Sequence, residues 1–241
     1  LVGGEPQGVL PVPRLEHAGD EESLRQRQTD QQFHHRPDRA LDQTRDGRAV
    51  KSGQQVMPGP ADSYIAYGRD WANVSNTPFR EYKHWVHEGG ISTPLIVHWP
   101  NGLPAARRGQ LETQPGHVID LMATCVELSG AAYPREWHGR PIKPMEGISL
   151  APALQGKPLK RAEPLFWEHE SNRAVRERQW KLVAKADQPW ELYDMDNDRT
   201  EMHDLASQHP QDVRRLAAKW DAWAARANVL PLGAWKENEP K

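Results

Sequence analysis

Four short segments between residues 165 and 194 have the composition of β-strands and are separated by polar turns. They are residues 165–169, 172–176, 180–184 and 190–194. Segments of this length, rich in aliphatic and aromatic residues and divided by turns, are typical of an antiparallel meander. The pattern therefore predicts a small antiparallel sheet in the last third of the 241-residue chain.

An amphipathic helix is predicted directly after these segments, over residues 210–226. Pro210 suits the first position of a helix, and Asp212 suits its positively polarised end. The apolar positions at helical spacing are Val213, Leu216, Trp220, Trp223 and Ala227. We expect this face to pack on the small sheet.

A second helix is predicted over residues 116–129, with Gly130 as its C-terminal stop. Its apolar residues at helical spacing are Val118, Leu121, Met122, Cys125, Val126 and Leu128. Cys125 is therefore expected to be a buried structural thiol. His117 opens this helix and is expected to cap it or to pack against it.

Composition excludes several classes of protein. The net charge of −2 gives no electrostatic reason to expect nucleic-acid or membrane binding. No apolar run approaches the roughly 20 residues of a membrane-spanning helix, and the start at Leu1 lacks the basic region of a signal peptide. The single cysteine excludes an intrachain disulfide. All ten tryptophans lie after residue 70, so the core is expected there.

Residues 1–43 differ from the rest of the chain. They are dense in Arg, Gln, Asp and His with isolated apolar residues, so they bury too little surface to offset the entropy of ordering. Two interpretations remain open. The segment is a reading-frame artefact or degenerate remnant, or it is an unstructured linker.

Residues 79–100 form the most distinctive block. Lys83 lies five residues before Glu88, and Gly89-Gly90 predicts a turn without the helix-opening pattern of a phosphate cradle. Residues 94–100 are an apolar run bracketed by prolines, which is typical of a strand buried on both faces of an α/β sheet. His98, inside that run, is expected to be a hydrogen-bonded core histidine.

This block resembles the sulfatase family, and most closely the bacterial arylsulfatases. The resemblance extends from about Thr44 to about Gly233, through residues 57–64, 73–80, 116–124 and 190–194. It implies an α/β fold: the C-terminal part of the mixed-sheet sandwich of the alkaline phosphatase and sulfatase superfamily, plus a small antiparallel sheet packed on a C-terminal helix.

The corresponding domain boundaries follow from the same resemblance. Residues 44–163 would form the C-terminal part of the catalytic domain, 164–233 the small C-terminal subdomain, and 234–241 a tail. Only the C-terminal portion of the family's fold is covered.

The resemblance also implies roles for individual residues. Lys83 matches the family's lysine that contacts the substrate sulfate. His84 and His87 flank Trp85 and would line the substrate pocket, although hydrogen-bonded loop histidines are as common. Trp71, Trp85 and Trp99 form either an aromatic wall for an aryl substrate or part of the core.

Two parts of the family's catalytic machinery have no match in this chain. Complete relatives use a formylglycine made from Cys or Ser in a C/S-x-P/A-x-R motif, whereas Cys125 is followed by Val-Glu-Leu-Ser. They also bind Ca²⁺ through Asp and Asn side chains. The acidic segment 194–201 fails the EF-hand pattern because Arg199 replaces the required glycine, so it is interpreted as a structural turn.

The sequence therefore predicts a fragment of an arylsulfatase-like sulfuric ester hydrolase that is inactive alone. It contributes the sulfate-anchoring lysine but no nucleophile, metal ligand or cofactor, and in a complete relative the substrate is a small-molecule sulfate ester. Two alternatives stay open. One is a phosphoester or phosphonate hydrolase of the same superfamily, and the other is a non-catalytic remnant or binding module.

Overall fold

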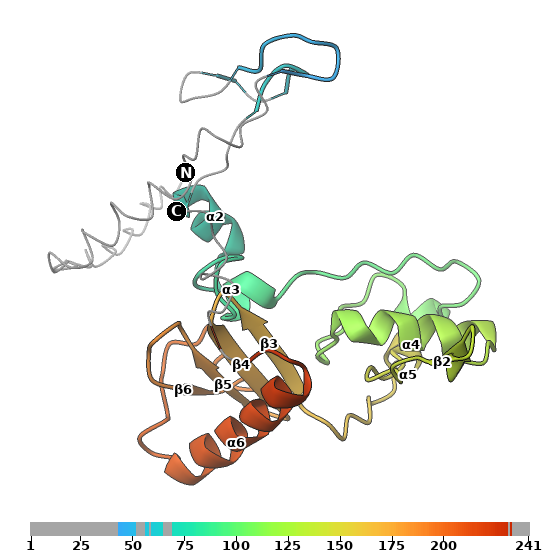
Figure 1. Ribbon diagram of the computed structural model, residues 1–241. Coiled ribbons are helices and arrows are strands. Elements are labelled where there is room, and N and C mark those ends of the chain that lie inside the picture. The colour runs from blue at the N-terminus through green and yellow to red at the C-terminus, as the bar shows by residue number, and fades with distance from the viewer. Residues whose placement is uncertain (1–42, 52–55, 58, 65–68, 231, 233–241) are drawn as a thin grey trace, which may run out of the picture. The chain divides into compact units, whose positions relative to one another are not determined.

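The computed structural model describes residues 43–51, 56–57, 59–64, 69–230 and 232 (Figure 1). The chain divides into two compact units, residues 1–68 and 69–241. Most of the segment expected to be unstructured or misread, and the tail from residue 234, lie outside the described residues. The domain boundaries expected at residues 43 and 163 stay predictions.

The described part of the first unit is small. Gln43 forms an antiparallel bridge with Ala49, and Lys51 forms a parallel bridge with Ser63. The Lys51 ammonium also lies 2.9 Å from the Asp62 carboxylate. The first bridge closes the short loop between Gln43 and Ala49, and the other two contacts join Lys51 to residues 62–63.

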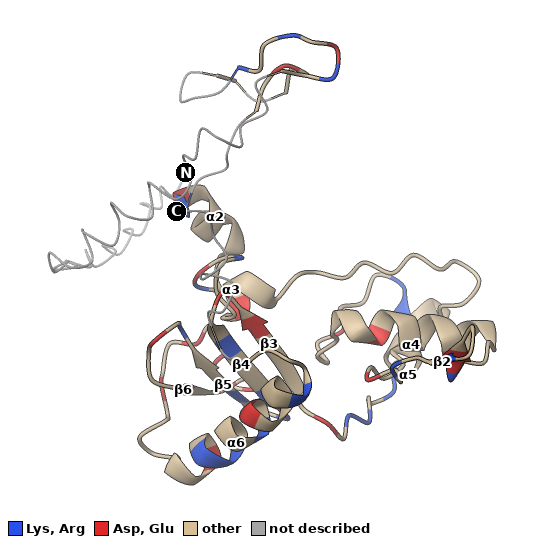
Figure 2. Cartoon of the chain, in the orientation of Figure 1, with Lys and Arg blue, Asp and Glu red and all other residues tan. Residues whose placement is uncertain are grey.

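The second unit contains all the helices and strands of the described chain. In order they are α2 Arg69–Asn76, α3 Glu88–Ile91, the 3-10 turn η2 Ala105–Arg107, α4 Val118–Ser129, β1 Glu136–Trp137, β2 Arg140–Pro141, α5 Ala151–Leu154, β3 Leu165–His169, β4 Asn172–Glu177, β5 Trp180–Ala184, β6 Glu191–Asp194 and α6 Pro210–Arg226. None of these helices is long and apolar enough to cross a bilayer. Acidic and basic residues are intermixed along the described chain (Figure 2).

The predicted meander is confirmed. Strands β3 to β6 form one antiparallel sheet in sequential order. Val175 pairs with Leu182, and Leu182 pairs with Leu192, so three aliphatic side chains align across the middle of the sheet. Because successive side chains of a strand point to opposite faces, their neighbours Ala174, Val183 and Tyr193 lie on the other face.

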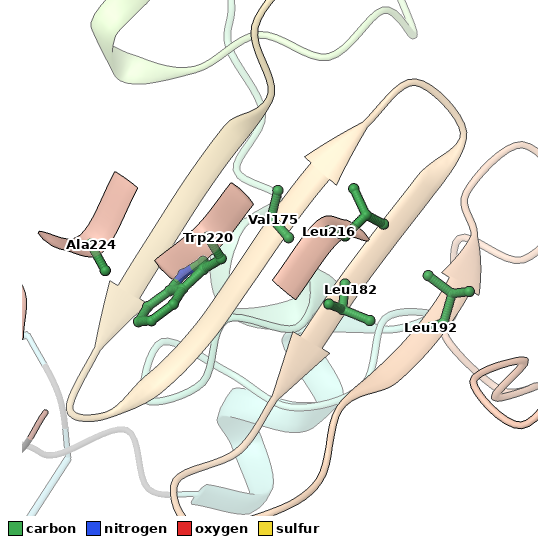
Figure 3. Close-up of a cluster of buried hydrophobic side chains, with 6 residues drawn as sticks. All are labelled: Val175, Leu182, Leu192, Leu216, Trp220 and Ala224. Atoms are coloured by element: carbon green, nitrogen blue, oxygen red, sulfur yellow. The ribbon is translucent and has the colours of Figure 1, made fainter. Parts of the chain in front are cut away.

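The predicted C-terminal helix is also confirmed, and it covers the first of these faces (Figure 3). Leu216, Trp220 and Ala224 are buried against the three aligned aliphatic residues of the sheet. The Trp220 indole N–H donates to the Trp167 carbonyl oxygen at 3.1 Å, and Trp223 stacks on Phe166. The expectation for Ala227 is wrong: it is the exposed C-cap, and Ala224 takes the buried position one turn earlier.

Residues 79–91 cover the opposite face of the sheet, a packing that the sequence did not indicate. Val86 is buried in a second core cluster with Ala174, Val183, Tyr193 and Met195. The sheet is therefore enclosed by α6 on one side and by this irregular segment on the other.

Helix α4 ends at the predicted residue, begins two residues later than predicted, and has a different buried face. Gly130 ends it in the left-handed conformation, and the His117 side chain caps it, as predicted. Cys125, however, is exposed, so the predicted buried thiol is wrong. The helix instead buries Asp120 and Ala123. Asp120 accepts a hydrogen bond from the Ile148 backbone and pairs with Arg161, which turns the apolar face toward solvent.

The strand predicted over residues 94–100 is absent from the structure. The segment has no regular structure, and Leu95, Ile96 and Val97 are exposed. His98 is exposed as well, so its expected place in a core is wrong. A strand requires a neighbour to satisfy its backbone groups, and no described strand pairs with this segment.

Candidate substrate-binding loop

The segment 79–91, here called the lysine loop, folds back on itself before it meets the sheet. The Gly89 backbone N–H donates to the Arg80 carbonyl at 3.1 Å, and the Trp85 N–H donates to the Tyr82 carbonyl at 2.9 Å. A Cβ atom on Gly89 would lie 2.2 Å from the Arg80 carbonyl oxygen, and one on Gly90 would lie 1.8 Å from that of Trp85. The close approach of the backbone therefore requires glycine at both positions. These glycines lie in the helical turn α3, not in the simple turn that the sequence predicted.

Lys83 lies at the outside of this loop. Its side chain is exposed, and it forms no ion pair with any other described residue. The residue before it is anchored: Tyr82 is buried and packs edge-to-face on Trp85. Among the described residues, the Lys83 ammonium group is therefore unpaired, and it stands on a well-supported backbone.

The lysine loop is held to the sheet in two places, the first of which is a polar network around Glu191, a residue of β6. Its Oε2 atom lies 2.8 Å from the Arg80 guanidinium and 3.1 Å from Nε2 of His87, and it accepts from the Tyr193 hydroxyl at 2.7 Å. Burial alone would raise the pKa of Glu191, but these hydrogen bonds and the Arg80 charge hold it at about 2. Burial and the bond to Glu191 raise the pKa of Tyr193 above its ordinary value.

The second support is a buried charge cluster around Lys181 of β5. Its Nζ atom lies 3.0 Å from Glu88 and 2.8 Å from Glu201, and all three side chains are almost completely buried. The Glu201 carboxylate also accepts from the Glu88 backbone N–H at 2.8 Å. Arg199 adds a second cation at 3.1 Å from Glu88. Burial opposes ionisation of Glu88, yet Lys181 and Arg199 keep its pKa below the usual value.

The structure separates the three residues that the sequence nominated for substrate binding. Lys83 and His84 are exposed, whereas His87 is completely buried and bonded to Glu191. His84 forms a 2.6 Å contact between Nδ1 and Glu170 at the β3–β4 turn. His87 therefore supports the loop from beneath, while Lys83 and His84 are accessible from outside.

The three tryptophans proposed as an aromatic wall are not brought together in the described structure. Trp71 is exposed on α2, and Trp99 packs over Gly102. Trp85 alone belongs to the lysine loop, where Lys185 lies 5.1 Å above its ring.

The acidic segment 194–201 serves the turn after β6. Asp194 accepts from the Asp196 backbone and the Asn197 side chain. Asp198 accepts from the backbone N–H groups of Met202 and His203. These carboxylates are used as turn-forming acceptors, in line with the structural interpretation of this segment.

Sequence reasoning missed the residues that position the loop, namely Arg80, Lys181, Glu191 and Glu201. One signal was present: Lys181 is a charge inside the otherwise apolar run 180–184. A charge at a buried strand position requires a partner, but the chain order alone does not say which acidic residue supplies it.

Comparison with known proteins identifies the fold. Residues 80–219, more than half of the chain, match the family model "N-sulphoglucosamine sulphohydrolase, C-terminal". The chain belongs to this sulfatase family. The matched span begins at Arg80, so it includes most of the lysine loop, both of its supporting networks and most of α6.

Individual relatives agree with the family assignment. An uncharacterized sulfatase of Schizosaccharomyces pombe is 29% identical over 71% of this chain and 32% of its own length. A sulfatase of Formosa agariphila is 29% identical over 68% and 32%, and the choline-sulfatase of Rhizobium meliloti is 28% identical over 72% and 33%. The crystal structure of Ps i-CgsB matches with a TM-score of 0.52 and 26% identity, covering 61% of this chain and 32% of that one.

This sulfatase-family chain spans about a third of the length of the curated relatives that it matches. The region in common is the C-terminal region of the sulfatase fold, with its small antiparallel sheet and terminal helix. The predicted fold class and family are therefore confirmed.

Proposed function

We propose that this chain is the C-terminal part of an arylsulfatase-type sulfuric ester hydrolase and that Lys83 anchors the substrate sulfate. The observation that carries the proposal is the placement of Lys83. It is an exposed ammonium without an ion-pair partner among the described residues, on a loop fixed to the sheet by a partly buried and a fully buried charge network.

The chemistry of the site suits a sulfate ester. A lysine ammonium is a compact point charge that complements a tetrahedral oxyanion, and it stabilises negative charge that develops as the ester bond breaks. Such stabilisation depends on groups held in place before the reaction. The docking of the loop through Arg80, His87 and Glu88 supplies that rigidity. His84, beside Lys83, is the second exposed polar group available to the substrate.

The described residues do not fit the calcium site of complete relatives. Calcium takes six to eight oxygen ligands. In the described part of the chain, the one group of three or more metal-capable side chains consists of His84, His169 and Glu170, and two imidazoles do not suit calcium. Cys125 lacks the sequence context for conversion to formylglycine. We therefore assign no catalytic step to metal or nucleophile here, and we propose that the chain alone does not turn over a sulfate ester.

The role of Lys83 is tested by grafting residues 80–91 into the Rhizobium meliloti choline-sulfatase at the matching loop. Lys83→Ala in the graft should lower turnover by about two orders of magnitude or more, as expected for loss of one donor to a developing oxyanion. Lys83→Arg should restore little activity, because a planar guanidinium is not a compact charge. Lys157→Ala, introduced separately in this chain, is the matched exposed-lysine control for stability.

Three outcomes would contradict the proposal. Full turnover of the Lys83→Ala graft would remove the anchoring role. A lowered melting temperature of Lys83→Ala in this chain, relative to Lys157→Ala, would assign Lys83 to the scaffold instead. Turnover of an aryl sulfate by the unmodified chain would show that a nucleophile has been overlooked, and parallel assays with an aryl phosphate separate sulfate from phosphate chemistry.

A further inference from the structure

Three metal-capable side chains from two distant parts of the sequence meet at the tip of the β3–β4 hairpin. His84 comes from the lysine loop, and His169 and Glu170 come from the end of β3 and its turn. One ligand atom from each residue lies within 4.8 Å of the other two. The Glu170 carboxylate is central: its Oε2 is 2.6 Å from His84 Nδ1, and its Oε1 is 4.0 Å from His169 Nε2.

The backbone beneath this cluster is fixed by a single buried amide. The Asn172 side chain donates to the carbonyl oxygens of His84, at 3.1 Å, and of His169, at 2.9 Å. Its own oxygen accepts from the Ala186 backbone N–H at 3.1 Å. Asn172 thus holds two backbone segments next to each other, although their histidines are 85 positions apart in the sequence.

The hairpin turn that carries Glu170 is also well defined. Glu170 and Ser171 both adopt positive φ, 51° and 70°, which is the conformation of a tight two-residue β-hairpin turn. The Ser171 backbone N–H donates to the Glu168 carboxylate at 2.7 Å. The turn is therefore held independently of any ion, and it directs Glu170 toward both imidazoles.

We propose that His84, His169 and Glu170 form a Zn²⁺ site. Two imidazole nitrogens and one carboxylate are an established ligand set for zinc, with a fourth position left for water or another ligand. Metal–ligand distances of about 2.0–2.2 Å require the three ligand atoms to move closer together. The side chains of His84, His169 and Glu170 are each at least about a third exposed, so they have room for this adjustment. Ca²⁺ and Mg²⁺ do not suit the set because they prefer oxygen ligands.

The site shares His84 with the proposed substrate-binding loop, but it does not depend on Lys83. It uses none of the atoms of Lys83 and none of the two networks that dock the lysine loop. Zinc would cross-link the lysine loop to the β3–β4 hairpin and so stabilise the folded chain, whether or not Lys83 contacts a sulfate.

The test is zinc binding by the full chain, measured by competition with a chromophoric chelator. His34 and His35 are adjacent in the sequence, so both are replaced by alanine in every sample to remove a competing pair. We expect one Zn²⁺ per chain. His169→Ala and Glu170→Gln should each weaken binding by at least about tenfold, whereas the exposed His98→Ala, outside the cluster, should not change it.

A second measurement separates ligation from folding. Zinc should raise the melting temperature of the parent chain and leave that of His169→Ala unchanged, while both show the same circular dichroism spectrum without metal. Co²⁺ should give the intense visible absorption of a four-coordinate site in the parent chain alone, and excess Ca²⁺ should not displace it. The proposal would be overturned if the parent chain bound no zinc, or if His169→Ala and Glu170→Gln bound zinc as tightly as the parent. It would also be overturned if His98→Ala weakened binding as much as those two variants.

Discussion

The Nζ atom of Lys181 lies 2.8 Å from Oε1 of Glu201, and both side chains are completely buried. Glu201 joins this pair from the turn after β6, in a positive-φ conformation of 58°, and Glu88 joins it from the lysine loop. The pair therefore links three separate segments on the face of the sheet that α6 does not cover. Its role is to fix the lysine loop, because Glu88 begins the single-turn helix α3 of that loop and Glu201 lies in a turn without regular structure.

Removal of the central cation should be strongly destabilising. Lys181→Met leaves the buried Glu201 without its cation and Glu88 with Arg199 alone, and we expect the free energy of unfolding to fall by about 3–5 kcal/mol. Urea unfolding followed by tryptophan fluorescence measures this change. Lys219→Met is the matched control, since Lys219 pairs with Glu177 at the surface and should cost no more than about 1 kcal/mol. Similar small losses in both variants would show that the buried cluster does not hold the fold.

The packing of α6 on the sheet depends on Trp220. Trp220→Ala removes a buried indole from the cluster in Figure 3 and leaves a cavity, so we expect a loss of about 3–5 kcal/mol. The exposed Trp71 provides a control: Trp71→Ala should change stability by less than about 0.5 kcal/mol. An equally small effect of Trp220→Ala, measured by the same urea unfolding, would show that α6 is not docked where the structure has it.

Stability should depend on pH through Glu191. Its pKa is lowered from 4.5 to about 2 in the folded chain, so the unfolded chain takes up a proton first as the pH falls. The ionised carboxylate therefore stabilises the fold above about pH 4.5, and this contribution is lost between about pH 4.5 and pH 2.

The comparison of the parent chain with Glu191→Gln isolates this contribution. At pH 7 the variant should be less stable by an amount on the order of 2 kcal/mol, and the difference should shrink as the pH is lowered toward 2. Urea unfolding at a series of pH values gives both curves. A difference that stays constant with pH would mean that Glu191 acts through shape and not through its charge.

The two glycines of the lysine loop should tolerate no side chain. Gly90→Ala places a Cβ atom 1.8 Å from the Trp85 carbonyl oxygen, so the loop must open, at a cost of about 1–3 kcal/mol. Limited proteolysis should then cut within residues 79–91. Gly116→Ala is the control, because its added Cβ would meet Leu150 at an ordinary 3.5 Å. Equal protease resistance of the two variants would contradict the closed loop.

Several elements were determined by the sequence alone. The bounds of β3, β5 and α6, and those of β4 to within one residue, follow from local signals: short apolar runs between polar turns, a proline at the first helical position and an apolar residue at every third or fourth place. These signals act between near neighbours, so they are present in the chain order. The lysine five residues before Glu-Gly-Gly was likewise visible, and so was the family that the pattern indicated.

The tertiary structure decided which faces are covered and how the lysine loop is held. The apolar sides of α4 and of residues 94–100 were expected to be buried, yet they are exposed. An apolar pattern indicates that a face favours burial, but it does not identify another segment that would cover the face. The support of Lys83 depends on Arg80 meeting Glu191 and on Glu88 meeting Lys181, residues that are 111 and 93 positions apart. Such pairings between distant charges carry no local periodicity, so only the folded chain reveals them.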